Sequence, residues 1–176
     1  MRLTIIMNKD KDLDIYFMQE ALLEAEKAYK SGDVPVGAVI VLDDKIIARG
    51  YNQVEFRNDP TAHAEILAIQ KAAAYLRNER LLHTTLYVTI EPCAMCAGAL
   101  VLARVKNLVY GADDPKTGAC GSIVNIIQHQ QGKPSCLNHQ LNVRKGVLKE
   151  EAKDLLQRFF KEKRKAEGKE GRKAEG

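Results

Sequence analysis

Leu86-Tyr87-Val88-Thr89-Ile90-Glu91-Pro92-Cys93-Ala94-Met95-Cys96 leads from an apolar segment straight into the start of a short helix. Residues 86–90 are apolar or β-branched, which is typical of a buried strand. Pro92 suits the first turn of a helix, because the N–H that it lacks would have no partner there. Cys93 and Cys96 share one face of that turn. Since a helix N-terminus favours thiolate over thiol, the stretch predicts two metal-binding sulfurs at a strand-to-helix junction.

His63-Ala64-Glu65 is a second group of residue types that bind metals or move protons. Residues two apart do not face each other along a helix, so both side chains reach one metal only from the mouth of a helix. Asp59-Pro60-Thr61 predicts such a start, with Asp59 or Thr61 as the N-cap of a helix over 62–76. The two segments together predict two helix N-termini that point toward one cation.

One imidazole and two thiolates make three protein ligands, and Glu65 is not needed as a fourth. Three ligands with an open position are the arrangement of catalytic zinc, whereas structural zinc has four ligands. Zinc lowers the pKa of a water in the open position to about 7, so that hydroxide is available at neutral pH. Glu65 is then free to move protons, and the pattern predicts hydrolysis at an electrophilic carbon.

Other interpretations of these residues stay open at this point. A CxxC pair also occurs in redox sites and as two small buried hydrophobes. A disulfide is disfavoured by the tight spacing and because the sequence shows no secretory signal. A structural zinc site would need a fourth ligand, and the chain offers several: His83, Cys120, His129, Cys136 and His139. Catalytic zinc is the interpretation that we favour.

Length and composition indicate one globular domain. The chain has 176 residues, of which 45% are hydrophobic, and a formal net charge of +4. Its four cysteines are too few for a disulfide framework and fit a reducing compartment. No apolar run approaches the ~20 residues of a membrane span, and the apolar residues 1–7 are too few for a secretory signal, so we expect a cytoplasmic protein. Residues 161–176 hold seven Lys or Arg and four Glu. Such a basic segment is typical of a solvated end, but it also suits phosphate contacts.

Hydrophobic periodicity predicts helices alternating with strands after an initial hairpin. The expected elements are a helix over 14–30, strands over 36–42 and 45–51, a helix over 62–76, a strand over 86–90, a helix over 93–103, a strand over 108–110, a loop, a short strand and a helix over 150–166. This order predicts an α/β fold, a three-layer α/β/α domain with a mixed central sheet. We expect that domain over 14–167, after an N-terminal extension over 1–13. The basic residues 168–176, which lack an apolar face, are expected to be disordered.

The chain resembles the cytidine and deoxycytidylate deaminase superfamily and, within it, the bacterial-type tRNA-specific adenosine deaminases. The resemblance covers roughly residues 14–165. It rests on these motifs: Val34-Pro35-Val36-Gly37-Ala38-Val39, Asn52, Asp59-Pro60-Thr61-Ala62-His63-Ala64-Glu65, Thr89-Ile90-Glu91-Pro92-Cys93 with Cys96, Gly111-Ala112-Asp113-Asp114, Lys116-Thr117-Gly118 and Phe159-Phe160.

The resemblance implies a cytidine-deaminase-like fold and a zinc-dependent tRNA adenosine deaminase. It implies that His63, Cys93 and Cys96 hold one Zn²⁺ and that Glu65 shuttles protons. Zinc-activated hydroxide would attack C6 of the wobble adenosine in a tRNA anticodon loop, leaving inosine. Members of this family are typically homodimers, so the implied partners are a tRNA anticodon stem-loop and a second subunit.

Five further residues match positions at which the family binds its substrate. Asn52 would hydrogen-bond the flipped nucleoside, Val36 and Ile90 would wall the base, Asp114 would touch the RNA backbone and Phe160 would stack. Each has a plainer interpretation as well. Asn52 and Asp114 suit turns, Val36 and Ile90 suit a strand core, and a helical Phe-Phe pair is mostly core.

The chain departs from the family pattern at Pro115, which stiffens the recognition loop, and over 128–136, which is longer than usual. Both departures bear on RNA contacts and leave the zinc chemistry untouched. Two rival functions remain. One is a zinc deaminase of a free base or nucleoside, of the guanine or cytosine type. The other is a non-catalytic nucleic-acid-binding module with structural zinc.

Overall fold

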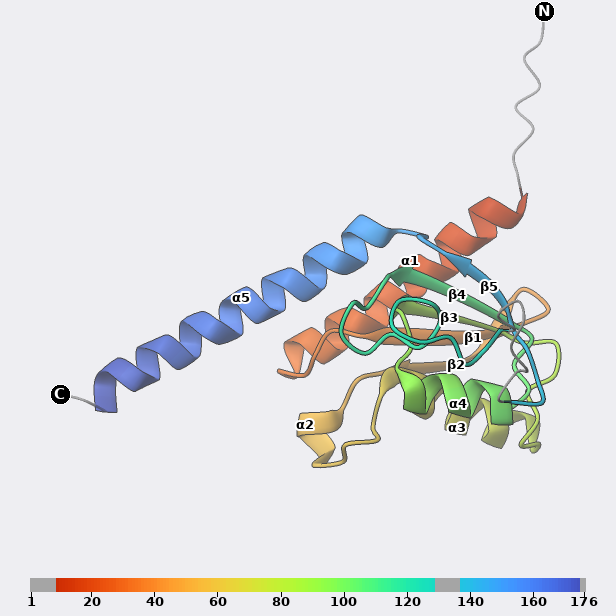
Figure 1. The fold of residues 1–176 in the computed structure, drawn as a ribbon, viewed down its shortest axis with the longest axis horizontal. Coiled ribbons are helices and arrows are strands. Elements are labelled where there is room, and N and C mark those ends of the chain that lie inside the picture. Colours follow the sequence, from red (N-terminus) through yellow and green to blue (C-terminus); the bar gives the residue numbers. More distant parts are fainter. Residues whose placement is uncertain (1–8, 129–136, 175–176) are drawn as a thin grey trace, which may run out of the picture.

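The computed structural model describes residues 9–128 and 137–174, and its side chains over 11–128 and 137–166. At its centre lies a five-stranded sheet in the order β2-β1-β3-β4-β5 (Figure 1). The strands are β1 (Gly37–Leu42), β2 (Lys45–Tyr51), β3 (Thr85–Ile90), β4 (Asn107–Ala112) and β5 (Asn142–Lys145). β1 runs antiparallel to β2 and β3, whereas β3, β4 and β5 run parallel to one another. The predicted mixed sheet is confirmed.

Over residues 9–128 and 137–174, five helices accompany the sheet: α1 (Lys9–Lys30), α2 (Val54–Arg57), α3 (Ala64–Leu76), α4 (Ala94–Leu102) and α5 (Lys149–Ala174). α3 and α4 cover one face, and α1 with the start of α5 covers the other (Figure 1). The alternation of side chains along β1 produces both cores. Ala38 and Ile40 are buried in the cluster with α3 and α4, while Val39 and Val41 are buried in the cluster with α1. The predicted three-layer α/β/α arrangement is therefore confirmed.

Two glycines let helices lie very close to the sheet. A Cβ at Gly37 would collide with the backbone of α1 at Ala21 and Ala25. A Cβ at Gly50 would collide with the backbone oxygen of Ala64, at the start of α3. Because Ala64 lies between His63 and Glu65, the missing side chain at Gly50 sets how near these two residues lie to the sheet.

Several helix boundaries differ from the predicted ones. α1 begins at Lys9, so part of the expected extension over 1–13 is helical. Residues 9–12 are all charged, and an argument from hydrophobic periodicity does not detect them. α3 begins at Ala64 rather than Ala62. The four-residue α2 was not predicted, because one turn carries no periodicity.

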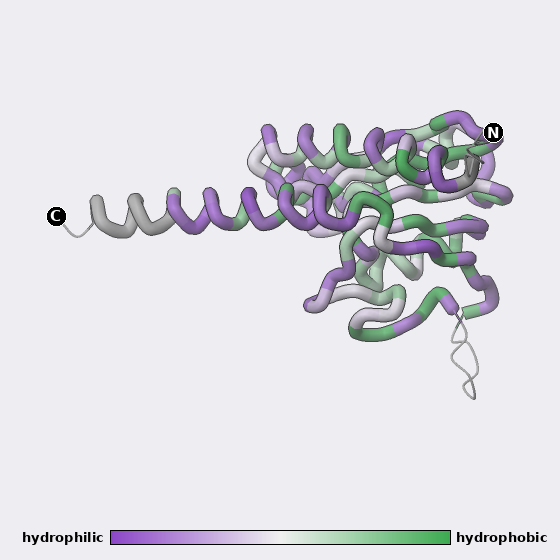
Figure 2. The backbone as a smooth tube through the Cα atoms, turned by 90° about the horizontal axis from the view of Figure 1, so that it is seen from above, coloured by the Kyte–Doolittle hydropathy of each residue, from purple (hydrophilic) through white to green (hydrophobic). Residues whose placement is uncertain are grey.

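α5 is continuous to Ala174, past residue 168, where composition predicts that order ends. Most residues of this part of the chain are Ala, Glu, Lys and Arg, which are strong helix formers, although Gly168 and Gly171 are not. The outer half of α5 projects beyond the domain (Figures 1 and 2), and its described part is largely hydrophilic. The unusually long segment 128–136 lies, apart from Gln128, outside the described residues. No helix of the described ranges is long and apolar enough to cross a membrane.

Candidate metal centre and active site

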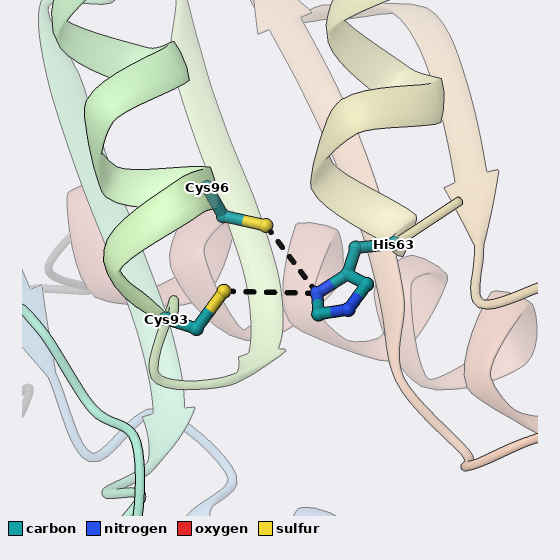
Figure 3. A group of neighbouring side chains, drawn as sticks. All are labelled: His63, Cys93 and Cys96. Carbon is teal, nitrogen blue, oxygen red and sulfur yellow. Dashed lines mark hydrogen bonds between the residues drawn. The ribbon is translucent and has the colours of Figure 1, made fainter. Parts of the chain in front are cut away.

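The side chains of His63, Cys93 and Cys96 converge from two helix starts (Figure 3). His63 is the N-cap of α3, with φ −72° and ψ 152°. Cys93 is the N-cap of α4, with φ −72° and ψ 174°, and Cys96 lies in the first turn of that helix. Neither N-cap side chain bonds its own helix, because both are directed at each other instead. The prediction of two helix N-termini meeting at one point is confirmed.

The predicted N-cap of α3 was wrong. Asp59 accepts hydrogen bonds from the N–H of Thr61 at 2.8 Å and from its hydroxyl at 2.7 Å. This closes a turn that precedes the helix rather than capping it. The turn nevertheless brings the chain into α3 with His63 at the first position.

The imidazole nitrogen of His63 lies close to the distance from both sulfurs that a tetrahedral zinc ion sets. Nδ1 of His63 lies 3.7 Å from Sγ of Cys93 and 3.6 Å from Sγ of Cys96. Zinc with Zn–S bonds of about 2.3 Å and Zn–N bonds of about 2.0 Å holds nitrogen and sulfur about 3.5 Å apart at the tetrahedral angle. The donor set and the spacing therefore both fit zinc.

In the described part of the chain, no fourth metal-binding side chain joins this group. His139 lies 2.7 Å from the carbonyl oxygen of Val105 through Nε2, and Cys120 is a buried free thiol. His83 does not join the group either, and His129 and Cys136 lie outside the described residues. The geometry thus favours a site with three protein ligands and an open position over a four-ligand structural site.

The two sulfurs shift each other's pKa in opposite directions. The hydrogen bond between the two sulfurs lowers the pKa of the Cys93 thiol to about 4. Burial opposes this shift, and the hydrogen bond with His63 adds to it. The same hydrogen bond and burial raise the pKa of Cys96. One sulfur is therefore ionised at the expense of the other. A divalent cation between them removes this conflict, because it deprotonates coordinating thiols outright.

Glu65 stands beside the metal group without belonging to it. It lies in the first turn of α3, its residue is only 4% exposed, and it faces the same cavity as His63 and Cys93. Burial raises the pKa of the Glu65 carboxyl above its ordinary value. A carboxyl whose pKa moves toward neutrality is suited to taking up and releasing protons. Its role as a proton shuttle stays a prediction.

A cavity of about 900 Å³ opens in front of these residues. All five residues predicted to contact substrate line it, although they come from five different parts of the fold. Val36 precedes β1, Asn52 follows β2, Ile90 ends β3, Asp114 lies in the loop after β4, and Phe160 lies on α5. The structure thus brings the complete predicted set together, around His63, Glu65 and Cys93.

The sequence left two interpretations for each of two residues: Asp114 as an RNA contact or a turn residue, and Phe160 as a stacking or a core residue. Their surroundings in the structure bear on both. The carboxylate of Asp114 accepts the N–H groups of Lys116 at 2.9 Å and Thr117 at 3.3 Å, and the Thr117 hydroxyl at 2.5 Å. Its side chain is therefore engaged in a turn of its own. Phe159 is 7% exposed and packs on Tyr29, whereas Phe160 is 39% exposed and lines the cavity. One ring of the pair belongs to the core and the other to the cavity.

Two buried acidic residues at the cavity were not singled out from the sequence. Asp33 accepts the N–H groups of Glu55 at 2.9 Å and Phe56 at 3.1 Å, and so holds the start of α2. Glu91 accepts hydrogen bonds from the loop that follows β4. For Glu91 the sequence offers one signal of a special role: a charged residue at the end of an apolar strand is unusual where both faces of the strand are buried.

The chain matches the MafB19-like deaminase family over residues 11–164. It is 48% identical over 152 residues to the tRNA-specific adenosine deaminase of Bacillus subtilis strain 168, covering 86% of this chain and 91% of the relative. It is 46% identical over 149 residues to the protein of the same name from Streptococcus pyogenes serotype M18, covering 85% and 91%.

Solved structures agree with these relatives. One from studies of A-to-I editing by tRNA:A34 deaminases superposes with a TM-score of 0.75 at 45% identity, covering 80% of this chain and 99% of the other. The guanine deaminase from Nitrosomonas europaea superposes with a TM-score of 0.67 at 26% identity, covering 82% and 83%. This chain therefore belongs to the MafB19-like deaminase family and, within it, to the tRNA-specific adenosine deaminases.

Proposed function

We propose that this protein converts adenosine to inosine at the wobble position of a tRNA anticodon loop, with water as the second substrate and ammonia as the second product. The observation that carries the proposal is the His63, Cys93 and Cys96 group with Glu65 lining the same cavity, in a chain 48% identical to a tRNA-specific adenosine deaminase. The geometry supplies the deaminase chemistry, and the similarity supplies the substrate class.

The residues of this chain have distinct roles in that reaction. His63, Cys93 and Cys96 would hold zinc, which when bound makes a water-derived nucleophile available at neutral pH. Glu65 takes the proton from the attacking water and delivers protons to the ring nitrogen N1 and to the departing amine of C6. Because Glu65 is buried, those protons pass between the reacting atoms rather than to bulk water.

The cavity walls account for recognition of the base. Val36 and Ile90 flank the purine with apolar surface, and Asn52 offers an amide that can donate and accept hydrogen bonds. A base in an anticodon loop is unpaired or easily flipped, so it reaches this cavity at a lower unstacking cost than a base in a duplex.

The cavity rim has the features of a single-stranded RNA site. Phe160 presents a partly exposed ring, and Lys116, Lys161 and Arg164 line the same cavity. Aromatic rings stack with bases, while Lys and Arg contact phosphates. We assign Phe160 to stacking and the loop of Asp114 and Lys116 to the RNA backbone.

We also propose that the protein is a homodimer. α4 contains no charged residue, yet its outer face is exposed at Met95 and Leu102, the latter to 78%. An apolar helix with an open face in a globular protein marks an interaction site. A second copy fits best, because the resemblance implies homodimers. The free thiols of Cys93, Cys96 and Cys120 fit a reducing compartment, and we propose the cytoplasm.

A deaminase of free guanine is the second candidate, favoured by the superposition on the guanine deaminase of Nitrosomonas europaea. The zinc-binding residues do not distinguish the two functions. The basic and aromatic segment of α5 does, since a free base needs no phosphate contacts.

Purified zinc-loaded protein is expected to release ammonia and form inosine from an anticodon stem-loop with adenosine at the wobble position. The same stem-loop with that adenosine moved to another loop position is the matched control and should react far more slowly. Free adenosine and free guanine should not be turned over. Turnover of guanine without turnover of the stem-loop would establish the rival function.

Glu65→Gln is expected to lower inosine formation by about 10²–10⁴-fold, because it removes the proton shuttle and keeps the shape of the side chain. Zinc content, measured by elemental analysis, should stay at one ion per chain. His63→Ala, which removes a ligand, should lose both zinc and activity. Full activity of Glu65→Gln would assign proton transfer to another group.

Lys161→Ala combined with Arg164→Ala is expected to weaken stem-loop binding and to flatten its salt dependence. Each lost phosphate contact should reduce the slope of log affinity against log salt by about 0.7. Lys153→Ala is the control, since Lys153 is exposed on the same helix but does not line the cavity. Fluorescence anisotropy at several salt concentrations measures both quantities. An unchanged slope in the double variant would remove these residues from the RNA site.

Leu102→Glu is expected to convert the dimer to monomer, because it places a charge in the proposed apolar contact. Leu23→Glu is the matched control: Leu23 is another exposed leucine, on α1 at the opposite face of the sheet. Sedimentation equilibrium gives the molar mass of each. A dimeric Leu102→Glu variant, or a monomeric wild type, would contradict the proposal.

A further inference from the structure

Glu91 is a buried carboxylate that the proposed reaction does not use. It follows the last residue of β3, precedes Pro92 and Cys93, and is 3% exposed. It lines the cavity but is not part of the metal group. Burying a carboxylate is costly unless it is hydrogen-bonded, so its contacts need a reason.

Both oxygens of Glu91 accept hydrogen bonds from one loop, residues 113–122. Oε1 accepts the N–H groups of Cys120 at 2.9 Å and Ser122 at 3.1 Å. Oε2 accepts the N–H of Asp114 at 3.0 Å and the hydroxyl of Ser122. The carboxylate therefore joins the first part of the loop to its last part, through four donors.

The same loop lies directly against the metal-binding turn. The N–H of Ala119 donates to the carbonyl oxygen of Pro92 at 2.9 Å, and Gly118 pairs with Cys93 across an antiparallel bridge. Gly118 has no room for a side chain, because a Cβ would lie 2.5 Å from Oε2 of Glu91 and from the carbonyl oxygen of Asp114. Glu91 thus lies between the loop and the turn that carries a zinc ligand.

The part of the loop held by Oε2 is the part that faces the cavity. Asp114 closes a tight turn over Lys116 and Thr117 with its own carboxylate, and all three residues line the cavity. That turn has internal hydrogen bonds, and backbone bonds hold the chain on either side of it, from Glu91 N–H to Ala112 and from Ala119 N–H to Pro92. Within the turn itself, the Asp114 N–H is bonded to the Glu91 carboxylate. This bond joins the cavity-facing turn of Lys116 to the residue two positions before Cys93.

We propose that Glu91 is a positioning residue for the nucleic-acid substrate, an inference that rests on the proposed function. Its carboxylate fixes the turn of residues 114–117 at a set distance from the metal group. One RNA strand can then place a phosphate at Lys116 and its target base at Glu65 at the same time. The role is one of binding geometry, so it acts on substrate affinity and not on the chemical step.

Replacing Glu91 by glutamine removes the bond to Asp114 while keeping the bonds to Cys120 and Ser122. Glutamine has one acceptor oxygen, and directing it at the N–H groups of Cys120 and Ser122 leaves its NH₂ group facing the N–H of Asp114. Two donors cannot bond each other, whereas the Ser122 hydroxyl can accept from the NH₂ group. Glu91→Gln therefore releases the cavity-facing turn and keeps the rest of the loop attached.

The test compares the zinc-loaded wild type with Glu91→Gln and Ser122→Ala, using the wobble-adenosine stem-loop. Glu91→Gln is expected to raise KM about tenfold with kcat within about twofold, since the lost interaction affects substrate placement only. Ser122→Ala removes one donor and keeps the bond to Asp114, so its KM should rise by less than about threefold. Zinc content should stay at one per chain in both. Hydrogen exchange should show faster exchange at residues 114–117 in Glu91→Gln alone.

An unchanged KM in an active Glu91→Gln variant would overturn the inference. So would loss of zinc or a fall in kcat at constant KM, because Glu91 would then support the Cys93 turn and not the substrate. Should Glu91→Gln fail to fold, faster exchange at residues 114–117 in a folded Glu91→Asp variant would uphold the attachment, and wild-type exchange there would overturn it. Failure of the proposed function looks different, since the wild type itself would then leave the stem-loop unreacted.

Discussion

The meeting of two helix N-termini at His63, Cys93 and Cys96 is the constraint on which the rest of the site depends. Each N-terminus carries about half a positive charge, so two of them repel a cation that lies between them. The negative charge of two thiolates outweighs that repulsion. Because the side chains of His63 and Cys93 point at each other, neither caps its own helix. The two helix starts therefore lack the stabilisation of a side-chain cap, and the same side chains are placed to bind a metal.

The sheet supplies the precision that this arrangement needs. β2 and β3 both run antiparallel to β1, so the segments leading into α3 and α4 leave the sheet at the same edge. Gly50 allows α3 to lie against β2 at the residue between His63 and Glu65. β3 and β4 run parallel, so Glu91 and the loop after β4 leave the sheet at the same edge. Ligand sites of α/β proteins lie at such carboxyl edges, because the loops there are held by neighbouring strands.

Much of the site could be predicted because its chemistry is encoded in short segments. The spacing of Cys93 and Cys96 on one helical turn, and the position of His63 at a helix mouth, follow from local geometry alone. Family motifs added Asn52, Val36, Ile90, Asp114 and Phe160, and all five line the cavity. Asp33 and Glu91 escaped notice because their partners, Glu55, Asp114 and Cys120, are distant in sequence. The N-cap of α3 was misplaced because Asp59 satisfies a turn as readily as a helix start.

By itself the sequence determined the α/β class, the three metal-binding residues, the neighbouring carboxylate and the kind of reaction, because spacing and residue type decide each of these within a few turns of chain. Only the tertiary structure decided which phenylalanine faces the cavity, that the Asp114 carboxylate serves its own turn, and that Glu91 joins the loop to the metal-binding turn. These depend on which surfaces meet when strands and helices pack, and contacts between distant residues leave no periodic pattern in the chain.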